Sequence, residues 1–128
     1  MATTPTRCLV NGRPGDTLSV RDRGLAYGDG LFETIRVSRG CATLLHLHLS
    51  RLARGAAVLR LALDLSQIQA ELEVAAAELG SGLLKLVVTR GEAGRGYAMP
   101  ESASPTCILH FSPLPDYPAA NAQQGISL

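Results

Sequence analysis

The sequence has few of the features that mark nucleic-acid-binding, membrane or exported proteins. Aromatic residues make up 4% of its 128 residues and the net charge is +1, which gives neither a stacking surface nor a basic field for nucleic acid. Its apolar stretches are much shorter than a membrane span, and the amino terminus holds no apolar segment of an export signal. We therefore expect no nucleic-acid partner and no membrane association.

Cysteine and histidine are too few and too unsuitably spaced for a metal site. Cys8, Cys41 and Cys107 form no Cys-x-x-Cys pair, so neither a disulfide framework nor a zinc site is indicated. A reducing, cytoplasmic setting is the simplest interpretation. His46 and His48 are two positions apart and would point about 200° apart on a helix. We expect no metal.

Lysine is almost absent, because Lys85 is the only one among twelve basic residues. It alternates with apolar neighbours, on the same face of a predicted strand as Leu83 and Val87. Burial could turn its amine into a nucleophile. A lysine that reaches along the sheet to water or to a carboxylate is the commoner case, so we do not expect Lys85 to be catalytic.

Hydrophobic residues are plentiful, at 46%, which is enough for the core of one modest domain. Alternation with a period of two predicts strands, and apolar spacings of three and four predict helices. The expected elements are strands over 7–10 and near 18–21, a loop over 24–30, strands over 31–38 and 41–45, helices from Leu45 and Ser66, and strands over 82–89 and 106–112. This order predicts an α+β fold, with a mostly antiparallel sheet and two helices on one face.

Local signals define the two helices more closely. One side of the first helix repeats apolar residues at steps of three and four: Leu45, Leu49, Leu52, Ala56, Leu59 and Leu63. Ser66 and Gln69 fit a capping box at the start of the second helix. Gly80 stands where a left-handed residue would end that helix.

Three arginines could bind an anion. Arg51 and Arg54 lie off the apolar side of the first helix, together with His48. A basic face in water is one interpretation, and a guanidinium that binds a phosphate or carboxylate through two hydrogen bonds is the other. The loop over 89–97 holds three glycines, and its Arg95 and Tyr97 could bind an anionic ligand, although a surface hairpin would use the same glycines.

Three segments together resemble a known enzyme family. Residues 21–34 (RDRGLAYGDGLFET) resemble the opening segment of fold-type IV pyridoxal-phosphate enzymes. Residues 46–52 (HLHLSRL) resemble the arginine motif of their first helix. Residues 84–91 (LKLVVTRG), followed by GRGY over 94–97, are similar to the aminodeoxychorismate lyases in particular. The segments keep the family's order and approximate spacing over nearly the whole chain.

The resemblance implies a cofactor, a reaction and roles for four residues. Arg51 would bind the phosphate of pyridoxal 5'-phosphate, and Phe32 would form part of the active-site wall. Arg95 and Tyr97 would lie near the substrate, whose carboxylates need a cation. In the lyase reaction, 4-amino-4-deoxychorismate releases pyruvate to give 4-aminobenzoate for folate biosynthesis. The family resemblance also implies a homodimer.

The resemblance implies as well that the Schiff-base lysine lies beyond Leu128. In the family this lysine follows an interdomain linker, and Lys85 does not align with it. We therefore expect residues 1–115 to form the N-terminal small domain, and residues 116–128 to be a linker and the start of a missing C-terminal domain. The 128 residues alone are expected to be inactive as a lyase and to contain no catalytic residue.

Two other functions are compatible with the same sequence. A class IV aminotransferase acting on branched-chain or D-amino acids would share the fold and the three motifs. A non-catalytic dimerising or binding module could reuse the domain without its chemistry.

Overall fold

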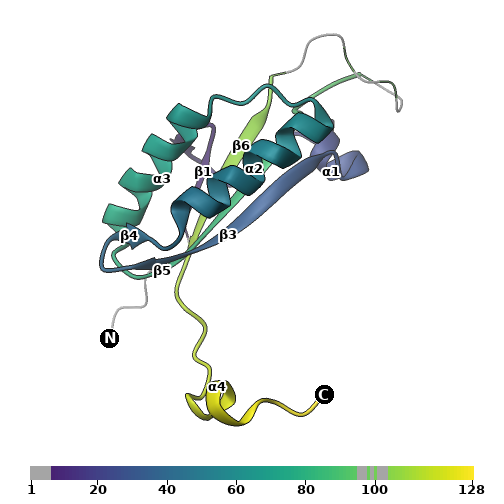
Figure 1. Ribbon diagram of the computed structural model, residues 1–128. Coiled ribbons are helices and arrows are strands. Elements are labelled where there is room, and N and C mark those ends of the chain that lie inside the picture. Colours follow the sequence, from purple (N-terminus) through teal and green to yellow (C-terminus); the bar gives the residue numbers. More distant parts are fainter. Residues whose placement is uncertain (1–6, 95–97, 99, 101–103) are drawn as a thin grey trace.

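The computed structural model describes residues 7–94, 98, 100 and 104–128. It confirms the α+β fold, because the described strands form one antiparallel sheet in the order β2-β1-β6-β5-β3-β4 (Figure 1). The strands are β1 (Arg7–Val10), β2 (Arg13–Pro14), β3 (Gly30–Ser38), β4 (Cys41–Ala42), β5 (Gly82–Thr89) and β6 (Thr106–Ser112). The helices are α1 (Arg23–Tyr27), α2 (Leu45–Leu59), α3 (Leu65–Leu79) and α4 (Ala120–Gln124).

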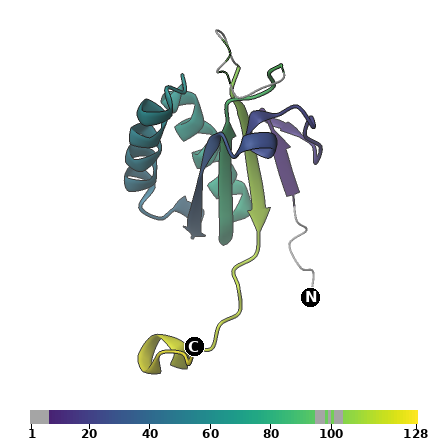
Figure 2. The same cartoon turned by 90° about the vertical axis from the view of Figure 1, so that its right-hand side faces the viewer.

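The core lies between the sheet and the two long helices. Figure 2 shows α2 and α3 on the same side of the sheet, as the sequence predicted. Alternation along β3 and β5 directs every second side chain toward the helices. The inward residues Ile35, Val37, Leu84 and Val88 have no exposed surface. Residues at the positions between them lie on the face that α2 and α3 do not cover.

Both long helices follow the predicted apolar spacing, but the end of α2 and the start of α3 differ from the prediction. The helix α2 ends at Arg60, which adopts a left-handed conformation with φ of 57°. The N-cap of α3 is Asp64 rather than Ser66: its carboxylate accepts a hydrogen bond from the Gln67 backbone N–H at 3.1 Å. The helix therefore starts earlier than predicted, and an aspartate satisfies an N–H group of its first turn in place of the serine. Gly80 ends α3 with φ of 73°, as predicted.

Short elements account for most other differences. The predicted strand near 18–21 is not formed, and β2 pairs with β1 through the Asn11-Gly12 turn instead. The predicted loop over 24–30 contains α1, and the return strand after Arg39-Gly40 stops at Ala42. The segment 125–128 forms no strand, and α4 occupies part of the expected linker. No helix in the described part of the chain is long and apolar enough to cross a membrane.

Candidate functional site

A buried carboxylate lies on the inner face of β3. Glu33 alternates with Ile35 and Val37, so the strand directs it toward α2, and it is only 3% exposed. A carboxylate in this position must find donors, because an unpaired buried charge is strongly unfavourable. The donors come from α2, which crosses this part of β3.

Arg51 and His48, one helical turn apart on α2, both contact Glu33. Arg51 Nε donates to Glu33 Oε1, and Arg51 Nη2 donates to Glu33 Oε2, each at 2.6 Å. His48 Nδ1 lies 2.7 Å from Oε2 of the same carboxylate. Because an ionised carboxylate only accepts, His48 Nδ1 carries the hydrogen of this contact. The three side chains therefore form one connected group.

The charges of this group stabilise each other. The hydrogen bonds from Arg51 hold the pKa of Glu33 below its ordinary value, those from His48 add to the effect, and burial partly opposes it. The same contact with Glu33 raises the pKa of Arg51. At neutral pH the pair is fully ionised, and Arg51 stays a cation.

Arg51 is well exposed although Glu33 is not. Its side chain is 66% exposed, and the remaining N–H groups on Nη1 and Nη2 have no acceptor among the described residues. It lines two hollows of about 330 and 320 Å³, and Arg54 lines both of them too. A guanidinium with free donors beside an open hollow can bind a phosphate or carboxylate oxygen.

Phe32 lies at the same end of β3 but on its other face. The ring is 64% exposed. It borders the hollow of about 330 Å³ that Arg51 lines, and also a third hollow of about 320 Å³, which lies beneath α1 and which Arg51 does not line. Leu31 lines both of these hollows as well. The end of β3 near Phe32 therefore separates a hollow that the Arg51 guanidinium lines from one beneath α1 that it does not line.

Lys85 lies close to Phe32 on β5. Its Nζ is 4.9 Å from the centre of the Phe32 ring, which is the geometry of a cation–π contact. The side chain is exposed on the face of the sheet that α2 and α3 leave uncovered. This environment does not desolvate the amine, which is what would activate it as a nucleophile.

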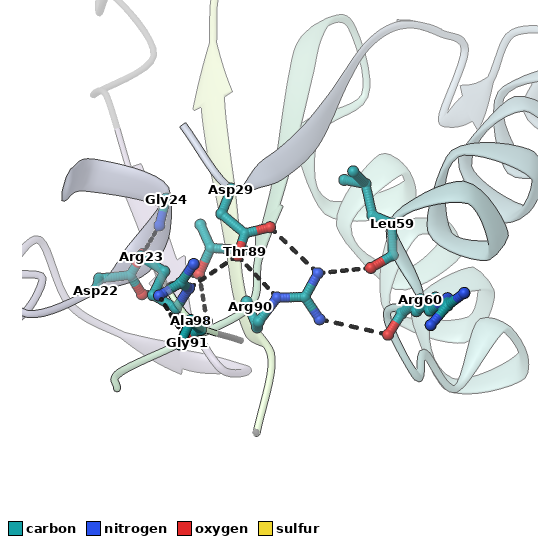
Figure 3. Close-up of polar contacts among 10 residues, drawn as sticks. All are labelled: Asp22, Arg23, Gly24, Asp29, Leu59, Arg60, Thr89, Arg90, Gly91 and Ala98. Carbon is teal, nitrogen blue, oxygen red and sulfur yellow. Dashed lines mark hydrogen bonds and ion pairs between the residues drawn. The ribbon is translucent and has the colours of Figure 1, made fainter. Parts of the chain in front are cut away.

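A second polar cluster joins the loop before β3 to the end of β5 and to the end of α2 (Figure 3). Arg90 Nε donates to Asp29 at 2.7 Å, and Arg23 Nε donates to the same carboxylate oxygen at 2.9 Å. Arg90 Nη2 also reaches the carbonyl oxygen of Leu59 at 2.6 Å, and Nη1 reaches that of Arg60 at 3.3 Å. A cation at these last carbonyls of α2 satisfies them and complements the helix dipole.

Asp22 extends this cluster toward α1. Its Oδ1 accepts the Gly24 backbone N–H at 2.8 Å, and its Oδ2 accepts the Thr89 hydroxyl at 2.9 Å. The Thr89 oxygen in turn accepts the Gly91 N–H at 3.0 Å. Among the described residues no buried side-chain polar atom lacks a hydrogen-bond partner, so these contacts fix the backbone around Asp22 and Thr89.

Sequence reasoning named some of these residues and missed others. Arg51 and Phe32 lie at one hollow, at the same end of β3. Arg95 and Tyr97 are outside the described residues, so their predicted roles remain predictions. Glu33 was missed, although a charge among inward-facing positions of a strand is a readable signal. Asp29 was interpreted only as a turn residue, because its arginine partner is 61 positions away.

Comparison with known proteins shows the family to which the chain is similar. The family model described as amino-transferase class IV matches residues 30–127. The D-alanine aminotransferase of Bacillus licheniformis is 33% identical over 131 residues, which covers 94% of this chain and 45% of the relative. The chain thus spans less than half the length of this curated relative.

Two solved structures are similar as well. The 4-amino-4-deoxychorismate lyase from Pseudomonas aeruginosa superimposes with a TM-score of 0.90 at 54% identity, covering 93% of this chain and 44% of that one. A hypothetical aminotransferase from Mycobacterium tuberculosis in its PLP-bound form gives a TM-score of 0.73 at 29% identity, covering 87% and 41%.

Proposed function

This chain belongs to the class IV aminotransferase family, and from that premise we propose that it is the N-terminal part of a 4-amino-4-deoxychorismate lyase. The observation that carries the proposal is the 54% identity to a lyase over 93% of the chain, with a TM-score of 0.90. The proposed reaction releases pyruvate and leaves 4-aminobenzoate. The proposal includes a homodimeric, cytoplasmic parent enzyme, and the free thiols of Cys8, Cys41 and Cys107 fit a reducing compartment.

The residues around Arg51 fit the phosphate end of pyridoxal phosphate, the cofactor of this family. Arg51 offers unused N–H donors at the edge of an open hollow, and Glu33, which is itself hydrogen-bonded to His48, holds it from the inner side. When bound, the cofactor supplies the electron sink for the reaction. Arg51 would hold its phosphate, and Phe32 would border the same cavity and exclude water from one side.

The remaining roles are assigned by resemblance. Arg95 and Tyr97 would bind carboxylates of the substrate. The Schiff-base lysine would lie outside these 128 residues, because Lys85 is exposed and held over the Phe32 ring. We further propose that residues 1–115 are the small domain and that 116–128 lead into a second one. In Figure 1 the chain leaves the sheet after β6, and α4 lies apart from it.

The test is a product assay with the longer protein that carries this chain. We expect 4-aminobenzoate and pyruvate to form in equal amounts from 4-amino-4-deoxychorismate, without an added keto acid. Amino-group transfer from D-alanine to a keto acid, with no 4-aminobenzoate, would favour the aminotransferase alternative that the Bacillus relative represents.

A second assay uses the 128 residues alone. Incubation with pyridoxal phosphate and borohydride, followed by peptide mass analysis, is expected to leave Lys85 unmodified, and the chain is expected to have no lyase activity. Stoichiometric reduction of the cofactor onto Lys85 would overturn the assignment of the anchoring lysine.

A further inference from the structure

The position of Glu33 calls for an explanation beyond packing. Its neighbours on the inner face of β3, Ile35 and Val37, are fully buried, and Glu33 itself is 3% exposed. An apolar side chain at such a site commonly stabilises a protein as well as a buried ion pair does, or better. Its main partner, Arg51, is mostly in water, where ion pairs add little stability. Stability therefore gives no reason for a carboxylate here.

The geometry of the contact offers a reason. Glu33 binds the side of the guanidinium formed by Nε and Nη2, which leaves the end formed by Nη1 and Nη2 for another acceptor. Two parallel N–H groups at that end match two oxygens of a phosphate monoester. Because a free arginine samples many rotamers, fixing it in advance removes part of the entropy cost of binding.

We propose that Glu33 is a positioning residue that holds Arg51 in the orientation in which it binds a phosphate monoester. The inference rests on the proposed function, in which that phosphate belongs to the cofactor. His48 completes the device, because its Nδ1–H donates to Oε2 of Glu33 and limits the rotation of the carboxylate. Of these three side chains only Arg51 contacts the phosphate, and Glu33 acts through it.

This arrangement also explains why arginine is required at position 51. A lysine ammonium is a point charge with no second edge, so Glu33 would occupy it as a counter-ion. The effect of removing Glu33 should therefore depend on the residue at position 51. When Arg51 is present, removing Glu33 weakens phosphate binding. When a lysine replaces Arg51, removing Glu33 frees the lysine ammonium from its counter-ion and does not weaken phosphate binding.

The experiment measures binding by NMR on the 128-residue chain labelled with ¹⁵N, so that millimolar affinities are accessible. The probes are pyridoxal phosphate and, as a phosphate-free control, pyridoxal. The variants are Glu33→Gln, Glu33→Asp, Arg51→Gln, Arg51→Lys and the double variant Glu33→Gln/Arg51→Lys. Glu73→Gln is the matched control, since Glu73 is an exposed carboxylate on α3 that accepts a hydrogen bond from Gln69. The backbone spectrum of each variant reports whether it is folded.

We expect pyridoxal phosphate to shift the Arg51 Nε–H signal of the unmodified chain, and pyridoxal to leave it unchanged. Glu33→Gln should weaken the phosphate-dependent affinity about tenfold, the scale on which a supporting hydrogen bond acts on a ligand-binding side chain. It should also speed the exchange of the Arg51 Nε–H with water. Compared with Glu33→Gln, Glu33→Asp should bind the phosphate more tightly and exchange the Arg51 Nε–H more slowly. Glu73→Gln should change neither the affinity nor the exchange rate. The double variant should bind no more weakly than Arg51→Lys.

The outcomes distinguish positioning by Glu33 from phosphate binding by Arg51. If Arg51→Gln abolishes phosphate binding but Glu33→Gln leaves it unchanged or tightens it, positioning by Glu33 is wrong and the role of Arg51 stands. If the Arg51 signal of the unmodified chain does not respond to pyridoxal phosphate, the phosphate role of Arg51 and this inference both fail, while the proposed lyase reaction is still judged by its products.

Discussion

At the scale of single residues, the pair formed by Glu33 and Arg51 is unequal in burial. Arg51→Gln would leave a buried carboxylate with His48 as its remaining side-chain donor, which is costly. Glu33→Gln would leave an exposed guanidinium that water solvates well. We therefore expect Arg51→Gln to lower the urea midpoint of unfolding clearly more than Glu33→Gln does. Equal midpoints for the two variants would mean that burial does not control the cost.

Thr89 is a second residue whose single hydroxyl serves two groups. It donates to Asp22 and accepts from Gly91, in a place that is 3% exposed. Thr89→Val keeps the shape and leaves a buried carboxylate oxygen and a buried N–H unpaired, which should lower the free energy of unfolding by about 1–3 kcal/mol. Thr34→Val, on the exposed face of β3, should change it little. Denaturant titrations of both variants measure the difference.

Local patterns could identify Arg51 but not the group around it. Arg51 is off the apolar side of its helix, which the sequence displays directly. The contact with Glu33 joins positions 18 apart on two elements, and it depends on where α2 crosses β3. The Asp29–Arg90 contact is further still from any local signal, since it requires β5 to pair beside the start of β3.

At the scale of elements, β3 packs closely against β5 at Gly30 and against α2 at Gly55, two glycines with different surroundings. A Cβ at Gly30 would lie 2.5 Å from the backbone oxygen of Val88, which the sheet holds in place. A Cβ at Gly55, within α2, would lie nearest to the methyl groups of the Leu31 side chain, at 2.9 and 3.0 Å. A methyl group can move aside when its side chain rotates, whereas a strand carbonyl cannot.

We expect Gly30→Ala to destabilise the protein by about 1–3 kcal/mol, because strand pairing must give way. Gly55→Ala should lie within about 1 kcal/mol of the unmodified chain, because the helix propensity of alanine offsets the contact with Leu31. Thermal unfolding of the two variants side by side checks this, and the reverse order would contradict the packing argument.

The sequence predicts elements well where their patterns are long. The strand over 106–112 and the start of α2 agree with the structure residue for residue. The helix α1 was missed because five residues are too few for a helical period to show. Its stability comes from Asp22, which caps it, and from the cluster below it.

At the scale of the whole molecule, two carboxylates give stability a dependence on pH. Hydrogen bonds from Arg90, and then Arg23, hold the pKa of Asp29 below its ordinary value, and those from Arg51 do the same for Glu33. A carboxyl group whose pKa is lower when folded contributes stability above its unfolded pKa. That contribution disappears as the pH falls through the unfolded value of about 4 and on through the lower folded value.

The expected result is a urea midpoint that is steady near neutral pH and falls from about pH 5 downward. Asp29→Asn and Glu33→Gln should each flatten that fall, and Glu73→Gln should not. A fall of the same steepness in all four proteins would show that other groups cause it.

The two carboxylates that fix α2 stand four positions apart in the sequence: Asp29 acts through Arg90, and Glu33 binds Arg51 directly. Since side chains of a strand alternate between faces, one residue inserted between them would turn Glu33 to the outer face and displace it from Arg51. This stretch should therefore tolerate substitutions far better than insertions or deletions. A change in length at the hairpin of Arg39-Gly40, beyond both contacts, would leave the spacing of the two carboxylates unchanged.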